Sequence, residues 1–200
     1  MSTIRMPAGE RRAALLDCAC RVFSDGSYRG TTTAEIAREA GVTEPILYRH
    51  FESKRDLYLA CCKESWARVK ALWDEAVANE PEPALWVGAM GRAFLESDVH
   101  RPLVSNLWIQ GMSEAAEDAE IRRYVRKHMR EVHAYVAGVI RRAQEHGGIP
   151  PDRDPDAEAW IFISIGLLSM AERCLDGLVK DGWDDIVSAR RRWLTDGRFS

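Results

Sequence analysis

The sequence predicts an all-α fold of about nine helices, divided into a three-helix N-terminal domain, residues 1–53, and a larger helical domain, residues 54–200. Apolar residues recur at helical spacing in one segment after another. No run of β-branched residues with period two and flanking turns occurs. The composition, 46% apolar and 30% charged among 200 residues, is that of a globular chain able to bury a sizeable core.

The first two helices are delimited by glycines and by a capping pair. The first is expected over residues 9–25, and Gly26 is placed to end it. The second begins at Thr32, because Thr32 and Glu35 fit the capping box, in which the threonine oxygen accepts a first-turn N–H group. Gly41 ends this second helix.

A short third helix and a long fourth helix follow. Thr43 is the natural N-cap of the third helix, where its hydroxyl is expected to accept an N–H group, and Pro45 fits the first turn. Ser53 caps the fourth helix, expected over residues 54–79, with Asp56 as its acidic partner.

The remaining helices are separated by clear breaks. They are expected over residues 84–96, 102–114, 118–146, 156–180 and 184–194. The segment GGIPPDRDPD between the third and fourth of these is a loop. The helix over 156–180 is apolar nearly all round, which predicts burial on every side.

Charge, cysteine content and targeting signals narrow the class further. The net charge is −3, but residues 1–57 carry nine Lys and Arg against eight Asp and Glu, a weak asymmetry of the sign expected for a nucleic-acid-binding N-terminus. The five cysteines lack zinc-site spacing and are interpreted as small buried residues, with a redox or metal site as the alternative. The first residues lack the apolar core of a signal peptide, and no apolar run is long enough for a membrane span, so a cytoplasmic protein is expected.

Residues 31–51 read as helix, glycine turn and short helix, which is a helix-turn-helix pattern. In such motifs the second helix lies in the major groove of DNA and its N-terminal residues meet base edges. The alternative is a compact packing unit with solvated charges. The candidate DNA-binding residues are Thr43, Glu44 and Pro45 toward the bases, and Thr31, Thr33, Tyr48, Arg49, His50 and Lys54 toward phosphates.

The stretch TTTAEIAREAGVTEPILYRHFESKRDL resembles the N-terminal signature of the tetracycline-repressor (TetR) family. The matching positions are Thr32, Thr33, Ile36, Ala37, Gly41, Val42, Thr43, Leu47, Tyr48, His50, Phe51, Ser53, Lys54 and Leu57. The likeness covers about residues 10–60. It implies that residues 1–53 form a DNA-binding domain, in which Thr43, Glu44, Pro45 and Ile46 face bases. It further implies that Tyr48, His50 and Lys54 hold phosphates, with help from Thr33.

Glu44 departs from the commoner family pattern, which places a lysine or a small polar residue there. A carboxylate near phosphates is repulsive, so Glu44 is interpreted in two ways. It accepts a hydrogen bond from a cytosine amino group, or it complements the helix dipole.

The larger domain is rich in tryptophan, phenylalanine and methionine, which form either an ordinary helical core or a cavity for an apolar ligand. The family resemblance implies such a cavity, and the effector is expected to be small and largely apolar. Its candidate lining residues are Trp66, Trp86, Met90, Phe94, Trp108, Met112, Phe162 and Met170.

The resemblance also implies a homodimer formed by the last two helices, so that two reading heads face a palindromic operator. The candidate interface residues are Trp160, Ile163, Leu167, Leu175 and Trp193. Effector binding is expected to shift the helix over 54–79 and to change the separation of the two heads.

The expected function is therefore a ligand-responsive transcriptional regulator, by resemblance a repressor, that uses no cofactor or metal. A helical protein-interaction module with a vestigial DNA-binding head is the alternative. An enzyme is not expected, because the chain has no nucleophile elbow, no glycine-rich phosphate loop and no metal-binding histidine pair.

Overall fold

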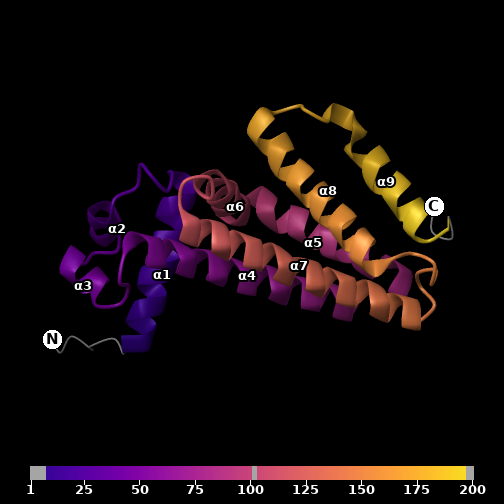
Figure 1. The fold of residues 1–200 in the computed structure, drawn as a ribbon, viewed down its shortest axis with the longest axis horizontal. Helices are drawn as coiled ribbons and strands as arrows, with labels where there is room; N and C mark the ends of the chain where they lie inside the picture. Colours follow the sequence, from indigo (N-terminus) through magenta and orange to yellow (C-terminus); the bar gives the residue numbers. More distant parts are fainter. Residues whose placement is uncertain (1–7, 101–102, 197–200) are drawn as a thin grey trace. The chain divides into compact units, whose positions relative to one another are not determined.

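The computed structural model describes residues 8–100 and 103–196, and in these residues it contains nine α-helices, two short 3-10 helices and no strand (Figure 1). The all-α class predicted from the sequence is therefore confirmed for these residues. The helices pack into two compact units. The first consists of the described parts of residues 1–68 and 100–125, and the second of those of residues 69–99 and 126–200.

The first unit is built around the N-terminal helices. It contains α1 (Ala8–Asp25), α2 (Thr33–Glu39), α3 (Glu44–Tyr48), the beginning of α4 (Lys54–Asn79), α6 (Leu103–Glu114) and the beginning of α7 (Ala119–Glu145). The observed bounds agree with the predicted ranges to within one or two residues. The residue predicted to open α6, Pro102, lies outside the described residues.

The core of the first unit extends past the predicted domain boundary at residue 53. Phe23 of α1, Ile36 of α2 and Leu47 of α3 are buried in one apolar cluster. The same cluster includes Tyr58 of α4 and Leu107 of α6, both fully buried. The first unit therefore does not end with the helix-turn-helix sequence, because the first turns of α4 supply part of its core.

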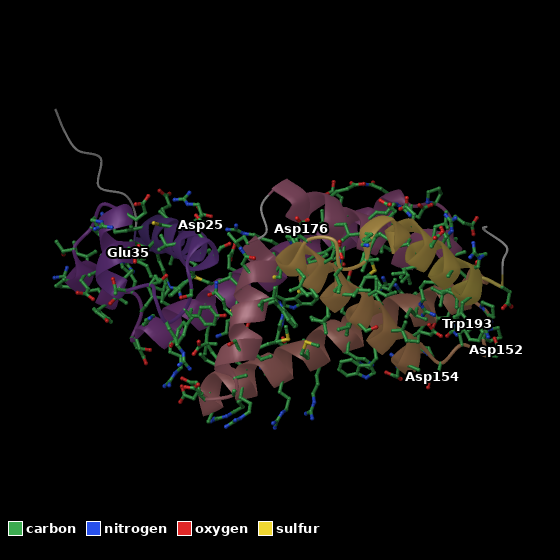
Figure 2. All side chains as sticks on the ribbon, turned by 90° about the horizontal axis from the view of Figure 1, so that it is seen from above. Asp25, Glu35, Asp152, Asp154, Asp176 and Trp193 are labelled. Carbon is green, nitrogen blue, oxygen red and sulfur yellow. The ribbon has the colours of Figure 1, made fainter. Side chains whose placement is uncertain are left out.

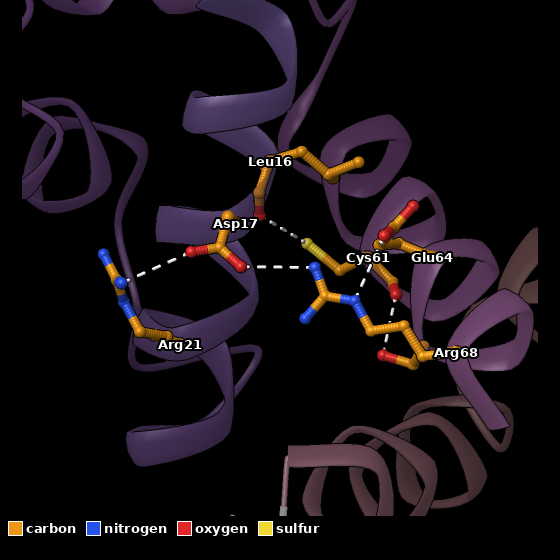
Figure 3. Close-up of polar contacts among 7 residues, drawn as sticks. Leu16, Asp17, Arg21, Cys61, Glu64 and Arg68 are labelled. Carbon is orange, nitrogen blue, oxygen red and sulfur yellow. Dashed lines mark hydrogen bonds and ion pairs between the residues drawn. The ribbon is translucent and has the colours of Figure 1, made fainter. Parts of the chain in front are cut away.

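Polar contacts also join α1 to α4 in this unit (Figure 3). The Asp17 carboxylate accepts hydrogen bonds from Arg68 at 3.2 Å and from Arg21 at 3.3 Å. The Cys61 thiol donates to the Leu16 carbonyl at 3.9 Å. Exposed ion pairs of this kind add little stability, so the apolar cluster supplies most of the energy that holds α1 on α4.

The second unit contains the remaining helices and their connections. They are the rest of α4, the 3-10 helix Pro83–Leu85, α5 (Trp86–His100), the rest of α7, α8 (Pro155–Leu175), the 3-10 helix Lys180–Gly182 and α9 (Trp183–Leu194). The predicted loop after α7 packs closely on the chain before α5. A Cβ atom at Gly148 would lie 2.5 Å from the Ala84 nitrogen, so only glycine fits there. Asp154 caps α8 by accepting from the Asp156 N–H at 2.9 Å.

One expectation for α8 was wrong, and a second is not met within one chain. The helix ends at Leu175 rather than near residue 180, because Asp176 and Gly177 both have positive φ, 45° and 82°. It is also not buried on every side, since Trp160 is 46% exposed and Ile161 is 39% exposed. Within one chain, α8 has neighbours along only part of its circumference.

Candidate DNA-binding interface

Local hydrogen bonds, some of them predicted from the sequence, hold α2 and the turn that joins it to α3. Thr32 Oγ1 accepts from the Glu35 N–H at 3.1 Å, which confirms the predicted cap. Gly41 adopts φ of 67°, and the Val42 N–H donates to the Ala37 carbonyl at 2.9 Å, as in a Schellman helix end. The left-handed residue at this position explains the glycine.

α3 is anchored on one face and open on the other. Leu47 is 1% exposed and packs in the core of the first unit. In contrast, Pro45, Tyr48 and Arg49 are exposed, while Ile46 is half-buried. A five-residue helix has little stability of its own, so this buried leucine and its neighbours hold it in place. The open face carries most of the residues predicted to meet DNA.

The predicted capping role of Thr43 was wrong. Thr43 occupies the N-cap position of α3 with an extended backbone, but its side chain makes no capping hydrogen bond. The Ile46 and Leu47 N–H groups donate instead to the Thr43 backbone carbonyl, at 2.9 and 3.2 Å. The exposed Thr43 side chain is therefore not committed to the helix start.

The two threonines expected to help with phosphates are withdrawn from the surface. Thr31 is 3% exposed and Thr33 is 9% exposed. The Thr33 hydroxyl donates to the Glu44 carboxylate and lies 3.1 Å from the Tyr48 hydroxyl. The structure thus brings Thr33, Glu44 and Tyr48 together, and the three side chains bond to one another. The burial of Thr31 contradicts a phosphate-binding role for its side chain.

Lys54 and His50 lie at the far end of the motif. His50 is half-buried. The Lys54 ammonium donates to the Arg29 carbonyl at 3.3 Å and lies 4.8 Å from the centre of the Tyr28 ring. Burial lowers the pKa of this ammonium. Ser53 caps α4 as predicted by accepting from the N–H three residues on, at 3.0 Å.

Sequence reasoning missed the ion pairs that join the α1–α2 connection and the first turn of α4 to the end of α6 and the start of α7. Arg29 pairs with Glu114 at 2.9 Å and with Glu117 at 2.6 Å. Arg55 pairs with Asp118 at 3.1 Å and with a second acid of α7 at 2.6 Å. No local signal could reveal these contacts, because the partners lie more than 60 residues apart in the chain.

Two amides of α6 also bond to the end of α1. Asn106 donates to the Ser24 carbonyl at 3.0 Å, and Gln110 donates to the Phe23 carbonyl at 2.8 Å. These carbonyls belong to the last turn of α1, which has no intrahelical partners for them. α6 therefore caps α1, the helix on which the helix-turn-helix packs.

Comparison with known proteins agrees with this geometry. Residues 15–61 match the family of bacterial regulatory proteins known as the tetR family, and residues 83–165 match the C-terminal domain of BetI-type transcriptional repressors. The HTH-type transcriptional activator FasR of Mycolicibacterium smegmatis is 52% identical over 56 residues, which are 28% of this chain and 26% of FasR. The HTH-type regulator BetI of Rhizobium meliloti is 34% identical over 116 residues, 56% of each chain.

The chain belongs to the TetR family. The matched segments nevertheless span only about a quarter and about half of these two relatives. A TetR-like fold is also shared with FadR of Bacillus subtilis, whose crystal structure is in complex with stearoyl-CoA. That structure has a TM-score of 0.73 and 16% identity, and the match covers 92% of this chain and 98% of FadR.

The residues predicted to line an effector cavity are divided between the two units of this TetR-family chain. Trp66, Trp108 and Met112 belong to the first unit, and Met112 is 39% exposed. The others, Trp86, Met90, Phe94, Phe162 and Met170, belong to the second unit. The predicted set therefore does not form one cluster within a single unit.

Within the second unit, part of this set is clustered. Phe162 of α8 packs edge-on against Trp73 of α4, with ring centroids 5.6 Å apart. A Cβ atom at Gly91 of α5 would lie 3.7 Å from the Phe162 ring. Met90 is fully buried. The indole N–H of Trp86 donates to the Glu80 carbonyl at 2.9 Å.

The predicted dimer residues lie on α8 and α9, which run side by side (Figure 1). Trp160, Leu175 and Trp193 are 46%, 64% and 57% exposed, and Leu167 is half-buried. Ile163 differs from them, because it is only 8% exposed and is packed in the interior of the second unit. The same region exposes further apolar side chains, which are Ile161, Leu178 and Val187.

Buried polar contacts fix α9 on α8. Glu158, 5% exposed, forms an ion pair with Arg190 and accepts from the Trp193 indole N–H at 3.3 Å. Arg153 lies over the Trp193 ring at 4.3 Å. Figure 2 shows Trp193 on α9 at the end of the unit that also carries the loop with Asp152 and Asp154. Trp193 is thus held in one orientation while much of its ring stays exposed.

Four of the five cysteines are buried as predicted, whereas Cys174 is exposed. Burial raises the pKa of the Cys62 thiol to about 12, so it stays protonated and unreactive. In the described part of the chain, no group of three or more His, Cys, Asp or Glu residues is arranged to hold a metal ion. None of the described helices is long and apolar enough to cross a membrane.

Proposed function

We propose that this chain is a ligand-responsive transcriptional regulator, by resemblance a repressor, that binds palindromic operator DNA as a homodimer in the cytoplasm. The one-sided anchoring of α3 carries the proposal, because the helix is held by Leu47 and offers its other face to solvent. We place Thr43, Pro45 and Ile46 toward the bases. The phosphate contacts we assign to Arg49, His50 and Lys54, because the Tyr48 hydroxyl is bonded to Thr33. Residues 1–53 act as the DNA-binding domain in this proposal, and residues 54–200 serve effector binding and dimerisation.

Footprinting tests the DNA-binding part. The purified chain is bound to a fragment from upstream of its own coding region and cleaved with hydroxyl radicals. Two protected half-sites with centres about 10 bp apart, or a multiple of one helical turn, are expected from a two-fold dimer. A single protected half-site, or protection without any sequence preference, would contradict the palindromic arrangement.

The exposed apolar side chains on α8 and α9 support dimerisation through these helices. An apolar patch of this kind on a soluble domain marks an interaction site. We expect Leu175→Asp, at a 64% exposed position, to convert a dimer into monomers in sedimentation experiments without unfolding the chain. Met112→Asp serves as the matched control, because Met112 is an exposed apolar residue outside α8 and α9. Equal effects of both variants, or a dimer that survives Leu175→Asp, would argue against this face.

We propose an effector that buries an apolar chain among α4, α5 and α8 of the second unit, beside Trp73 and Phe162. FadR of Bacillus subtilis, which shares the fold, was crystallised with stearoyl-CoA, so acyl-CoA thioesters are the first class to test. Tryptophan fluorescence is titrated with acyl-CoAs of increasing chain length, with free CoA as the control. Each buried methylene contributes about 0.8 kcal/mol, so affinity should rise with chain length. Affinity that is independent of the chain, or equal for free CoA, would oppose an apolar site.

Release of DNA would then pass through α4, whose residues run through both compact units. A 100-fold weakening of operator binding needs about 2.7 kcal/mol of coupling between the effector and DNA sites. A crosslink that fixes the two reading heads of the dimer should abolish release while effector still binds. Undiminished release from the crosslinked protein would exclude a change in head separation.

A further inference from the structure

The Thr33 side chain connects two positions on α3. Its hydroxyl donates to the Glu44 carboxylate, and the Tyr48 hydroxyl lies 3.1 Å from the same Thr33 oxygen. Thr33 is the first residue of α2 and is 9% exposed, whereas Tyr48 is 47% exposed. A buried hydroxyl of one helix thus ties two side chains of the other.

The directions of these hydrogen bonds follow from the number of protons. A carboxylate only accepts, and a threonine hydroxyl has one proton, which goes to Glu44. The bond between Thr33 and Tyr48 must therefore use the Tyr48 proton, with Thr33 Oγ1 as acceptor. The Tyr48 hydroxyl therefore donates to Thr33, and the Thr33 hydroxyl donates to Glu44.

The spacing of the two α3 residues makes this connection a constraint on rotation. Glu44 and Tyr48 are four residues apart, so they lie on the same face of α3, one turn above the other. A single anchor that holds both of them fixes how α3 is turned about its axis. The turn of a recognition helix decides which of its side chains face the bases.

We propose that Glu44 is a positioning residue, which through the Thr33 hydroxyl fixes the rotation of α3 and the place of Tyr48 and does not itself contact a base. This inference rests on the proposed DNA-binding function. It removes the need for a carboxylate to approach phosphates, because the Glu44 side chain is directed to a protein hydroxyl. It also assigns Thr33 a role between two α3 residues rather than on the DNA backbone.

The variant Glu44→Gln separates positioning from base reading. Its side-chain carbonyl still accepts from Thr33, so the preferred sequences selected from a random DNA library should be those of the wild type. Loss of the negative charge should strengthen non-specific binding. A glutamate that read cytosine would instead, as glutamine, favour adenine at that position. A changed preference at one base pair of the selected site would overturn the proposal.

Loss of the connection should weaken operator binding without creating a preference for a different base at any position. Glu44→Ala and Thr33→Val each remove the hydrogen bond to the charged carboxylate and should each weaken operator binding by about tenfold or more. Tyr48→Phe removes a hydrogen bond between two neutral hydroxyls, so its effect should be smaller, up to about tenfold. Thr33→Ser, which keeps the hydroxyl, should restore most of the affinity. In the double variant Glu44→Ala, Thr33→Val, the second change should add little. Additive losses would mean that the two residues act independently.

A cycle on the free protein makes the inference testable apart from DNA binding. The unfolding midpoints of Glu44→Ala, Tyr48→Phe and the double variant are compared in the wild-type and Thr33→Val backgrounds. Coupling between positions 44 and 48 that disappears with Thr33→Val supports the connection, and absence of coupling refutes it. If the wild type bound no DNA specifically, the proposed function would fail, and with it the positioning role, whatever this cycle showed.

Discussion

The hydroxyl group of Tyr58 bonds α4 to α6 and also limits the size of the residue at position 111. Tyr58 is fully buried, and its O–H donates to the Leu107 carbonyl at 2.6 Å. A Cβ atom added at Gly111 would lie 3.3 Å from the Tyr58 oxygen and 3.4 Å from Val125 Cγ2. Changes at positions 58 and 111 should therefore depend on one another.

The magnitudes follow from these contacts. Tyr58→Phe removes one hydrogen bond, at a cost of about 0.5–1.5 kcal/mol in the free energy of unfolding, toward the low end because the Leu107 carbonyl lies inside a helix and keeps its helical donor. Gly111→Ala gains about 1 kcal/mol of helix propensity but loses about 1–3 kcal/mol by overpacking against the hydroxyl. In the Tyr58→Phe background the hydroxyl is absent, so Gly111→Ala should be neutral or stabilising.

Denaturant unfolding of the wild type, both single variants and the double variant measures this dependence. We expect a favourable coupling of about 1–2 kcal/mol, with the double variant more stable than the sum of the single effects predicts. The edge-to-face packing of ring 58 on Phe23, with centroids 5.3 Å apart, should survive in phenylalanine and keeps the fold intact. Additivity to within about 0.5 kcal/mol would refute the close approach of α6 to α4 at this point.

Two further predictions concern the second unit. Gly148→Ala should lower the free energy of unfolding by about 2 kcal/mol or more, because the new Cβ would meet the backbone at Ala84. Gly138→Ala on α7 has open space and should raise the free energy of unfolding by up to about 1 kcal/mol. Thermal unfolding of both variants checks this prediction, and equal effects would contradict it. His128 is 4% exposed, and burial lowers its pKa to about 4, so below pH 6.5 the unfolded chain binds a proton that the folded chain does not. The free energy of unfolding should then fall by about 2 kcal/mol between pH 7 and pH 5 through this group, and His128→Gln should be flatter over that interval if the reasoning holds.

Features set by neighbours in the sequence could be predicted well. The Thr32 cap of α2, the Ser53 cap of α4 and the left-handed Gly41 all involve groups within six residues of one another. The helix ranges followed because apolar residues recur at helical spacing and glycines or prolines interrupt them.

Features set by distant parts of the chain could not be predicted from the sequence. The Thr33 hydroxyl was expected on a phosphate but bonds to side chains 11 and 15 residues away. Arg29 finds its partner 85 residues later, at Glu114. Glu44 was interpreted as a base reader or a dipole partner because its real neighbour becomes adjacent only after α2 and α3 fold together. Spacing tells which side chains share a face, but it does not tell what that face meets.

The most direct test of DNA binding through α3 is a salt titration of operator affinity for the wild type and one charge variant. Binding to a fragment from upstream of the coding region should weaken by about 10³ or more between 50 and 200 mM salt. Arg49→Ala, which removes an exposed guanidinium at the end of α3, should reduce the slope of log affinity against log salt by about one. Arg92→Ala, an equal loss of charge on α5, should leave the slope unchanged. Equal slopes for the wild type and both variants would contradict contact between this end of α3 and the DNA backbone.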